Sequence, residues 1–123
     1  DIVVTGRVPD VRPYLQHAAA VIAPMRIARG IQNKVLEGMA MGRVVVTTPM
    51  GLEGIQASAG RHLLVSDKPA AMAEQVTQAL LGRYAGMGTA ARELIRERYD
   101  WRIATAGFLD MVAGDTASQQ VCR

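Results

Sequence analysis

The residues best placed to do chemistry lie between positions 24 and 37, where a glycine-containing loop leads directly into a helix. At a helix start the first backbone N–H groups have no partner within the helix, and the helix dipole adds positive potential. Three cations close to these amides complete an arrangement that favours a phosphate or diphosphate as ligand. The amides belong to Ile31, Gln32 and Asn33, the cations are Arg26, Arg29 and Lys34, and the glycine is Gly30.

One carboxylate, Glu37, lies about one turn into the same helix. There it can accept hydrogen bonds from neighbouring hydroxyl groups, as an acidic side chain does from ribose in nucleotide sites. A simpler interpretation is also open, in which the arginines are merely solvated and Glu37 pairs with Lys34 three residues earlier. The residue types alone leave both interpretations standing.

Glu53 is a second acidic candidate, because it follows a glycine just beyond a predicted strand. It can approach the same ligand or be an ordinary loop carboxylate. The sequence shows no Ser, His and Asp set for nucleophilic catalysis and no cluster with metal-ligand spacing.

The elements that position these residues follow from four short apolar runs, which predict buried strands. The strands span residues 2–5, 20–23, 44–48 and 62–65, and the helices about 13–20, 33–41, 69–81, 88–98 and from 101 onward. Asn33 is the expected N-cap of the second helix, and Gly42 ends it. Apolar strands that alternate with helices predict an α/β fold, a Rossmann-like parallel sheet with helices on both faces.

The opening of the chain predicts a piece of a longer protein. It starts directly with an apolar strand pattern, and four strands are fewer than the roughly five or six of a usual sheet. We expect residues 1–114 to be the later part of one domain, with residues 115–123 as a frayed tail. A missing neighbouring strand would leave a sheet edge exposed, and such an edge favours a dimer.

Composition excludes several classes of protein. Half of the 123 residues are apolar and 20% are charged, which is globular rather than disordered. The single cysteine, Cys122, excludes a disulfide scaffold. The net charge of +3 is dispersed and aromatic residues make up only 4%, so we expect no nucleic-acid binding. No apolar run has the length of a membrane span, and we expect a cytoplasmic protein.

Residues 29–42, followed by the β-branched strand, resemble the signature of the retaining GT-B glycosyltransferases, and more narrowly of the large group 1 family. That signature is an acidic residue, a glycine, about six positions, and then Leu-Glu-Ala-Met-Ala-x-Gly. Flanking segments are also similar to the family, so the resemblance covers nearly the whole chain. They are residues 5–10, 20–24, 51–54, 60–65 and 99–101.

The resemblance implies that the chain is the later part of a C-terminal, donor-binding domain. The N-terminal acceptor domain and the first strands would be absent. Such an enzyme transfers a sugar from a nucleotide-sugar to a glycan or lipid-linked acceptor, with retention of configuration. The resemblance also implies that it needs no metal or other cofactor, because the helix dipole and basic side chains neutralise the departing diphosphate. By resemblance, Glu37 holds the ribose, the amides of residues 31–33 hold the diphosphate, and main-chain groups line the base. The base-lining residues are Gly6, Arg7, Val8 and Pro9.

Arg29 is the main departure from the family, whose first acidic residue stands eight positions before the second. A guanidinium cannot accept hydrogen bonds from a sugar, but it can donate to an anionic sugar or a phosphate oxygen. A surface ion pair without a ligand is the plainer interpretation. We take Arg29 and Glu37 as the catalytic candidates. The pattern around them resembles a branch linked to bacterial exopolysaccharide assembly.

Three further expectations follow from the resemblance. This chain would be inactive alone, because the acceptor site lies in the other domain. The full-length enzyme would contact the inner face of the membrane peripherally. The competing hypotheses are a GT-B-like nucleotide-sugar epimerase or phosphorylase, and a non-catalytic α/β interaction module.

Overall fold

The computed structural model describes the backbone of residues 1–120 and the side chains of residues 1–113. Its centre is a parallel sheet of three strands, in the order β1 (Ala20–Ala23), β2 (Val44–Thr47) and β3 (Leu64–Val65). Val21 pairs with Val45, and Val46 pairs with Leu64. Two of the predicted strands therefore form as expected, and a shorter one follows.

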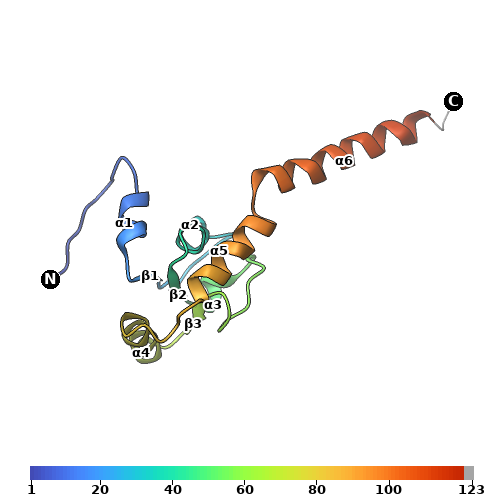
Figure 1. Ribbon diagram of the computed structural model, residues 1–123. Helices are drawn as coiled ribbons and strands as arrows, with labels where there is room; N and C mark the ends of the chain where they lie inside the picture. Colours follow the sequence, from blue (N-terminus) through green and yellow to red (C-terminus); the bar gives the residue numbers. More distant parts are fainter. Residues whose placement is uncertain (121–123) are drawn as a thin grey trace.

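Helices cover both faces of this sheet (Figure 1). On one face α2 (Asn33–Ala40) and α5 (Met87–Arg98) bury a cluster that includes Val45 of β2. On the other face α4 (Pro69–Leu80) packs beside Val46, because successive side chains of a strand point to opposite sides. The predicted α/β fold with a two-sided parallel sheet is confirmed.

Two glycines allow α5 to lie directly on the end of α2. Gly42 adopts φ +68° just beyond α2 and ends that helix, as predicted. A side chain at Gly88 would collide with the carbonyl oxygen of Gly42, so only glycine permits this approach. The contact fixes the far end of α2, whose first turn carries the candidate site.

The predicted strand at residues 2–5 is wrong. Ile2, Val3 and Val4 are 94%, 81% and 90% exposed and form no strand. The segment extends away from the body before α1 (Arg12–His17) (Figure 1). A β-branched run forms a strand only where another strand can pair with it, and in the described residues none lies beside this segment.

Several predicted boundaries also need correction. The first helix ends at His17 rather than near Ala20, because the chain turns extended at Ala18 to enter β1. β3 begins at Leu64 and not at His62, whose backbone N–H closes a turn onto Ser58. A short helix that was not among the predicted ones, α3 (Pro49–Leu52), follows β2.

The last helix, α6 (Trp101–Gln120), projects away from the body (Figure 1). It continues past residue 114, so the predicted frayed tail is helical as far as Gln120. Residues 121–123, which include Cys122, lie outside the described residues. Within the described part of the chain, no helix combines the length and apolar character needed to cross a membrane.

Candidate functional site

The loops after the three strands emerge at one edge of the sheet, where parallel sheets bind ligands. Two threonine hydroxyls, at the end of β2 and just after it, hold the last residue of β1 and the loop that follows, called here the β1–α2 loop (residues 24–32). Thr47 donates from Oγ1 to the carbonyl of Ala23 at 2.8 Å, and Thr48 donates to the carbonyl of Met25 at 2.6 Å. Sequence reasoning missed this role, because it treated the threonines only as β-branched strand residues.

The segment after β2 packs against the far end of the β1–α2 loop. Thr48 is the N-cap of α3, and its hydroxyl accepts a hydrogen bond from the Gly51 amide at 3.2 Å. Gly54 adopts φ +80°, and a Cβ at this position would lie 3.3 Å from Cγ1 of Ile31. The β1–α2 loop is thus held at its base by Thr48 and bordered near its end by Gly54.

The start of α2 is left open. Its N-cap is Gln32 rather than the expected Asn33, and the Gln32 side chain does not cap the helix. Instead Nε2 of Gln32 donates to the carbonyl of Gly30 at 3.1 Å. Within the described residues, the backbone amides from Ile31 to Lys34 donate to no recorded acceptor, and the first bonded one is Val35, to Gln32. These amides match the predicted donor set, with Lys34 added.

The charged candidates around this helix start are exposed and unpaired. Both ion pairs of the described residues lie elsewhere, at Asp10–Arg12 and Asp100–Arg102. The alternative pairing of Glu37 with Lys34 does not form. Arg29 also forms no ion pair within the described residues. The exposed and unpaired candidates are Arg26, Arg29, Lys34, Glu37 and Glu53.

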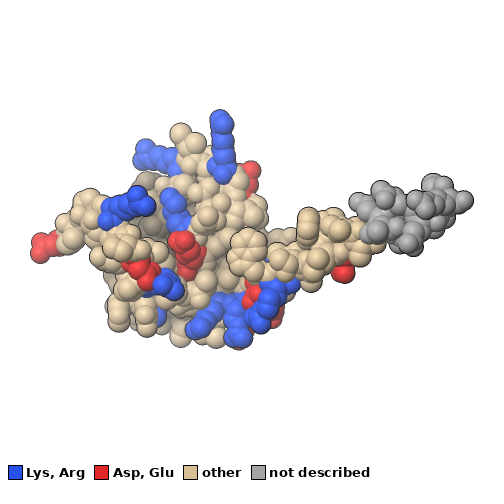
Figure 2. Space-filling view, turned by 90° about the horizontal axis from the view of Figure 1, so that it is seen from above, with Lys and Arg blue, Asp and Glu red and all other residues tan. Residues whose placement is uncertain are grey.

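The four residues predicted to line the base lie outside the loops that follow the strands. Gly6, Arg7 and Pro9 are exposed, Val8 is half-buried, and all four lie on the segment before α1. Among the described residues, no hydrogen bond joins this segment to the β1–α2 loop. Figure 2 shows basic side chains at separate places on the face in view, with acidic ones between them.

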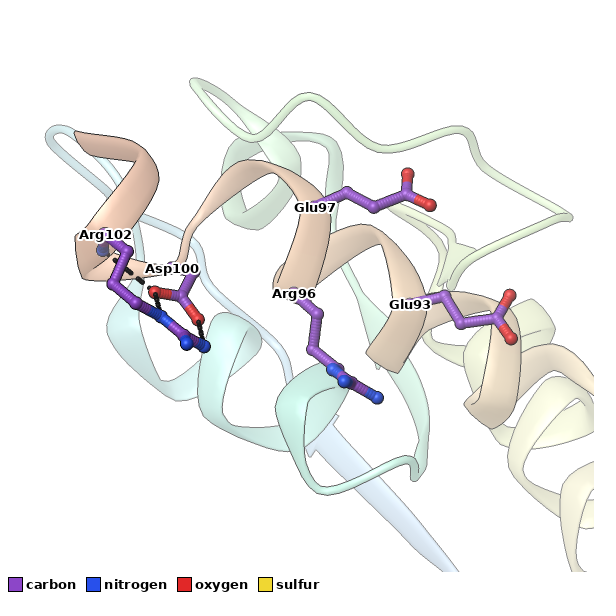
Figure 3. Close-up of a pocket in the computed structure, with 5 residues that line it drawn as sticks. All are labelled: Glu93, Arg96, Glu97, Asp100 and Arg102. Carbon is purple, nitrogen blue, oxygen red and sulfur yellow. Dashed lines mark hydrogen bonds and ion pairs between the residues drawn. The ribbon is translucent and has the colours of Figure 1, made fainter. Parts of the chain in front are cut away.

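Two hollows lie near charged side chains, and in one of them a carboxylate is already hydrogen-bonded within the protein. One of about 370 Å³ lies beyond the carboxyl ends of the strands and includes Arg26. Another of about 450 Å³ lies where α5 meets α6 (Figure 3). In the second, Asp100 accepts from the Arg102 guanidinium at 2.9 Å and from the Arg102 amide at 2.8 Å, and these bonds lower the Asp100 pKa to about 2. That carboxylate is engaged in starting α6.

His62 is a buried side chain with a structural role that the sequence did not reveal. Its Nδ1 accepts a hydrogen bond from the backbone amide of Ser58 at 3.0 Å. Burial lowers the His62 pKa below its ordinary value of 6.5, and the positive charges of Arg61 and Arg98 lower it further. The imidazole is therefore a neutral acceptor. Across the described residues, no group of three or more His, Cys, Asp or Glu side chains could hold a metal ion.

The comparison that decides the family concerns residues 1–81. They match the family model described as glycosyl transferases group 1, which spans about two thirds of the chain. The chain belongs to this family. No curated protein and no solved structure matches it. This glycosyltransferase has every predicted site residue inside the matched range, from Gly6 to Glu53, whereas α5 and α6 lie outside it.

Proposed function

We propose that this glycosyltransferase binds the diphosphate of a nucleotide-sugar at the start of α2. One observation carries the proposal: four unbonded amides from Ile31 to Lys34 coincide with unpaired cations on the same loop. Amides and a helix dipole that no capping side chain satisfies form a standard anion site. Arg26 and Lys34 add charge at its border.

Glu37 completes the donor site by accepting hydrogen bonds from the ribose hydroxyls. It lies one turn further along α2, it is exposed, and it has no ion-pair partner in the described part of the chain. A free carboxylate at this position is the acceptor that two neighbouring hydroxyls require. Glu53, at the end of α3, approaches the same ligand from the segment after β2.

In the transfer step, the bond between the anomeric carbon and the diphosphate oxygen breaks, and a bond to an acceptor hydroxyl oxygen forms. Negative charge grows on the departing diphosphate, and the acceptor hydroxyl gives up its proton to that diphosphate. The amides of residues 31–34 are already oriented, so they stabilise that charge without rearrangement. We propose that this arrangement replaces a metal and that the sugar is transferred with retention, in a GT-B enzyme.

In this proposal, Arg29 contacts a negatively charged group of the nucleotide-sugar. Its guanidinium is exposed, forms no ion pair within the described part of the chain, and can only donate hydrogen bonds. It therefore donates to a phosphate oxygen or to the carboxylate of an acidic sugar. The acceptor in the proposal is a glycan or a lipid-linked glycan of exopolysaccharide type, reached by the full-length enzyme at the inner face of the membrane.

In this proposal the chain is a donor-binding part without transfer activity of its own. The acceptor site would lie in another domain, and among the described residues no hydrogen bond joins the residues predicted for the base to the β1–α2 loop. In the described sheet β1 pairs only with β2, so its other edge is open. A second copy or a further strand would cover that edge.

The experiment is ligand-observed NMR with UDP, GDP and ADP, repeated on Glu37→Ala. We expect one nucleotide to bind the wild type and its affinity to fall at least about tenfold in the variant, as after loss of a charged hydrogen-bonding partner. Glu93→Ala, which removes an exposed carboxylate from α5, is the matched control and should bind like the wild type. Absence of binding by both this chain and the full-length protein would overturn the proposal.

A further inference from the structure

One residue outside the family match is joined to the donor site through the segment after β2. The backbone amide of Gln56 donates to the hydroxyl of Tyr99 at 2.9 Å. The neighbouring Arg98 donates from Nη1 to Oε1 of the same glutamine at 2.7 Å. Gln56 is therefore held through both its backbone and its side chain by the end of α5, more than forty positions away in sequence.

Gln56 lies two residues after Gly54, which borders the β1–α2 loop. A Cβ at Gly54 would be 3.3 Å from the Ile31 side chain, so the two segments are in close contact. Ile55, which lies between Gly54 and Gln56, is only 6% exposed, and its amide donates a hydrogen bond to the carbonyl of Leu52. A displacement at Gln56 therefore reaches Ile31, whose own amide opens the unbonded donor set.

The Tyr99 ring and its hydroxyl have separable roles. The ring is half-buried and packs against the core cluster that contains Ile55 and Leu94. Among the described residues, the hydroxyl takes part in one hydrogen bond, which it accepts from the amide of the exposed Gln56. Water can satisfy that amide when the hydroxyl is removed. Removing the oxygen alone leaves the packing intact and frees the segment.

We propose that Tyr99 is a positioning residue for the donor site, and that its hydroxyl sets the place of the Gly54 turn against Ile31. The inference rests on the proposed function, because it assigns the β1–α2 loop to the diphosphate. Residues 82–123 lie outside the matched family range, so the comparison itself assigns Tyr99 no role. A displacement of about 1 Å at such a support weakens binding and catalysis well beyond its effect on stability.

The test compares Tyr99→Phe with Tyr84→Phe in the full chain. Tyr84 is also half-buried, but it packs on the opposite face of the sheet, among the residues around Val46. Each variant is titrated with UDP, GDP and ADP, its melting temperature is measured, and its ¹⁵N–¹H spectrum is recorded without ligand. We expect Tyr99→Phe to weaken binding of the nucleotide that the wild type prefers by roughly three- to tenfold. Its melting temperature should change by less than about 2 °C, while the amide signals of Ile31 and Gln32 shift.

The outcomes separate this inference from the proposed function. If Glu37→Ala loses the nucleotide while Tyr99→Phe binds normally, the positioning role is overturned and the donor site stands. If no nucleotide binds, the ligand-free spectrum still decides, because only a positioning role moves the Ile31 and Gln32 amides. A shift confined to Gln56 and its neighbours, or a large fall in melting temperature, would mean that Tyr99 merely supports the fold.

Discussion

The starts of α2 and α6 solve the same local problem in opposite ways. Each helix begins with backbone amides that its own turns cannot satisfy. At α6, Asp100 accepts from the Arg102 amide and also binds the Arg102 guanidinium. At α2, the N-cap Gln32 turns its side chain back to Gly30 and leaves the amides unbonded.

The difference separates a structural helix start from one available to a ligand. A carboxylate on the first amides stabilises a helix but repels any anion that approaches them. The neutral Gln32 forgoes that stabilisation and keeps the positive end of α2 accessible. The uncapped start of α2 follows the loop that leaves the carboxyl end of β1, whereas α6 projects from the body (Figure 1).

Placing a capping carboxylate at the start of α2, like the one at the start of α6, should have the largest effect on nucleotide binding. Gln32→Asp is expected to stabilise the chain by about 0.5–1 kcal/mol and to weaken nucleoside diphosphate binding at least about tenfold, because like charges meet. Thermal denaturation and NMR titration measure the two quantities. Gln32→Asn caps without charge and should weaken binding only a few-fold. Unchanged affinity in Gln32→Asp would place the diphosphate elsewhere.

Removing the cap of α6 should have a smaller, local effect. Asp100→Ala is expected to reduce the helical signal in circular dichroism by on the order of one turn, because the Arg102 amide loses its acceptor. Nucleotide affinity should stay within about twofold, since α6 starts beyond the supporting Tyr99. Asp110→Ala, an exposed carboxylate in the interior of α6, is the control. Equal losses in both variants would refute the capping role.

Lowering the pH should have the smallest effect on stability. It should weaken the hydrogen bond accepted by His62 but not those accepted by Asp100. The folded-state pKa of His62 lies below 6.5, so its contribution to stability is complete above that pH and is lost as the pH falls through the lowered value. The melting temperature should fall by on the order of 2–4 °C between pH 7.5 and 5. The Asp100 cap persists, because its pKa is about 2.

His62→Asn tests that difference, since an amide oxygen can accept from Ser58 but takes up no proton in this range. Its melting temperature should change less with pH than that of the wild type. His17→Asn replaces an exposed histidine of α1 and should keep the wild-type dependence. If the melting temperature of His62→Asn changes with pH as much as that of the wild type, another group controls the loss of stability in acid.

The fold could be predicted where sequence pattern and burial agree. Residues 44–47 are β-branched and become the central strand, buried from Val45 to Thr47. Residues 2–5 have the same pattern but remain exposed, because burial depends on a partner that composition does not report. The helices α2, α4 and α5 were predicted to within a residue or two, since caps and periodicity are local signals.

Of the candidate site too, only the features that depend on neighbouring residues in the sequence could be predicted. The open amides at residues 31–33 follow from a loop entering a helix, a local feature. The hydroxyl of Thr48 and the hydroxyl of Tyr99 were missed, because their partners lie 23 and 43 positions away. Such long-range contacts leave no pattern in a single sequence. The roles of Arg29 and Glu37 stay predictions.

The Thr48 bond to Met25 has a consequence for how this site can be altered. It secures the base of the β1–α2 loop, and the Gly54 turn supports the other end at Ile31. Residues 26–30 between these two supports are exposed or half-buried and make little contact with the core. In the proposed donor site, these five residues can therefore be exchanged by grafting, so that the ligand contacts change while Thr48 and Gly54 keep the rest of the fold in place.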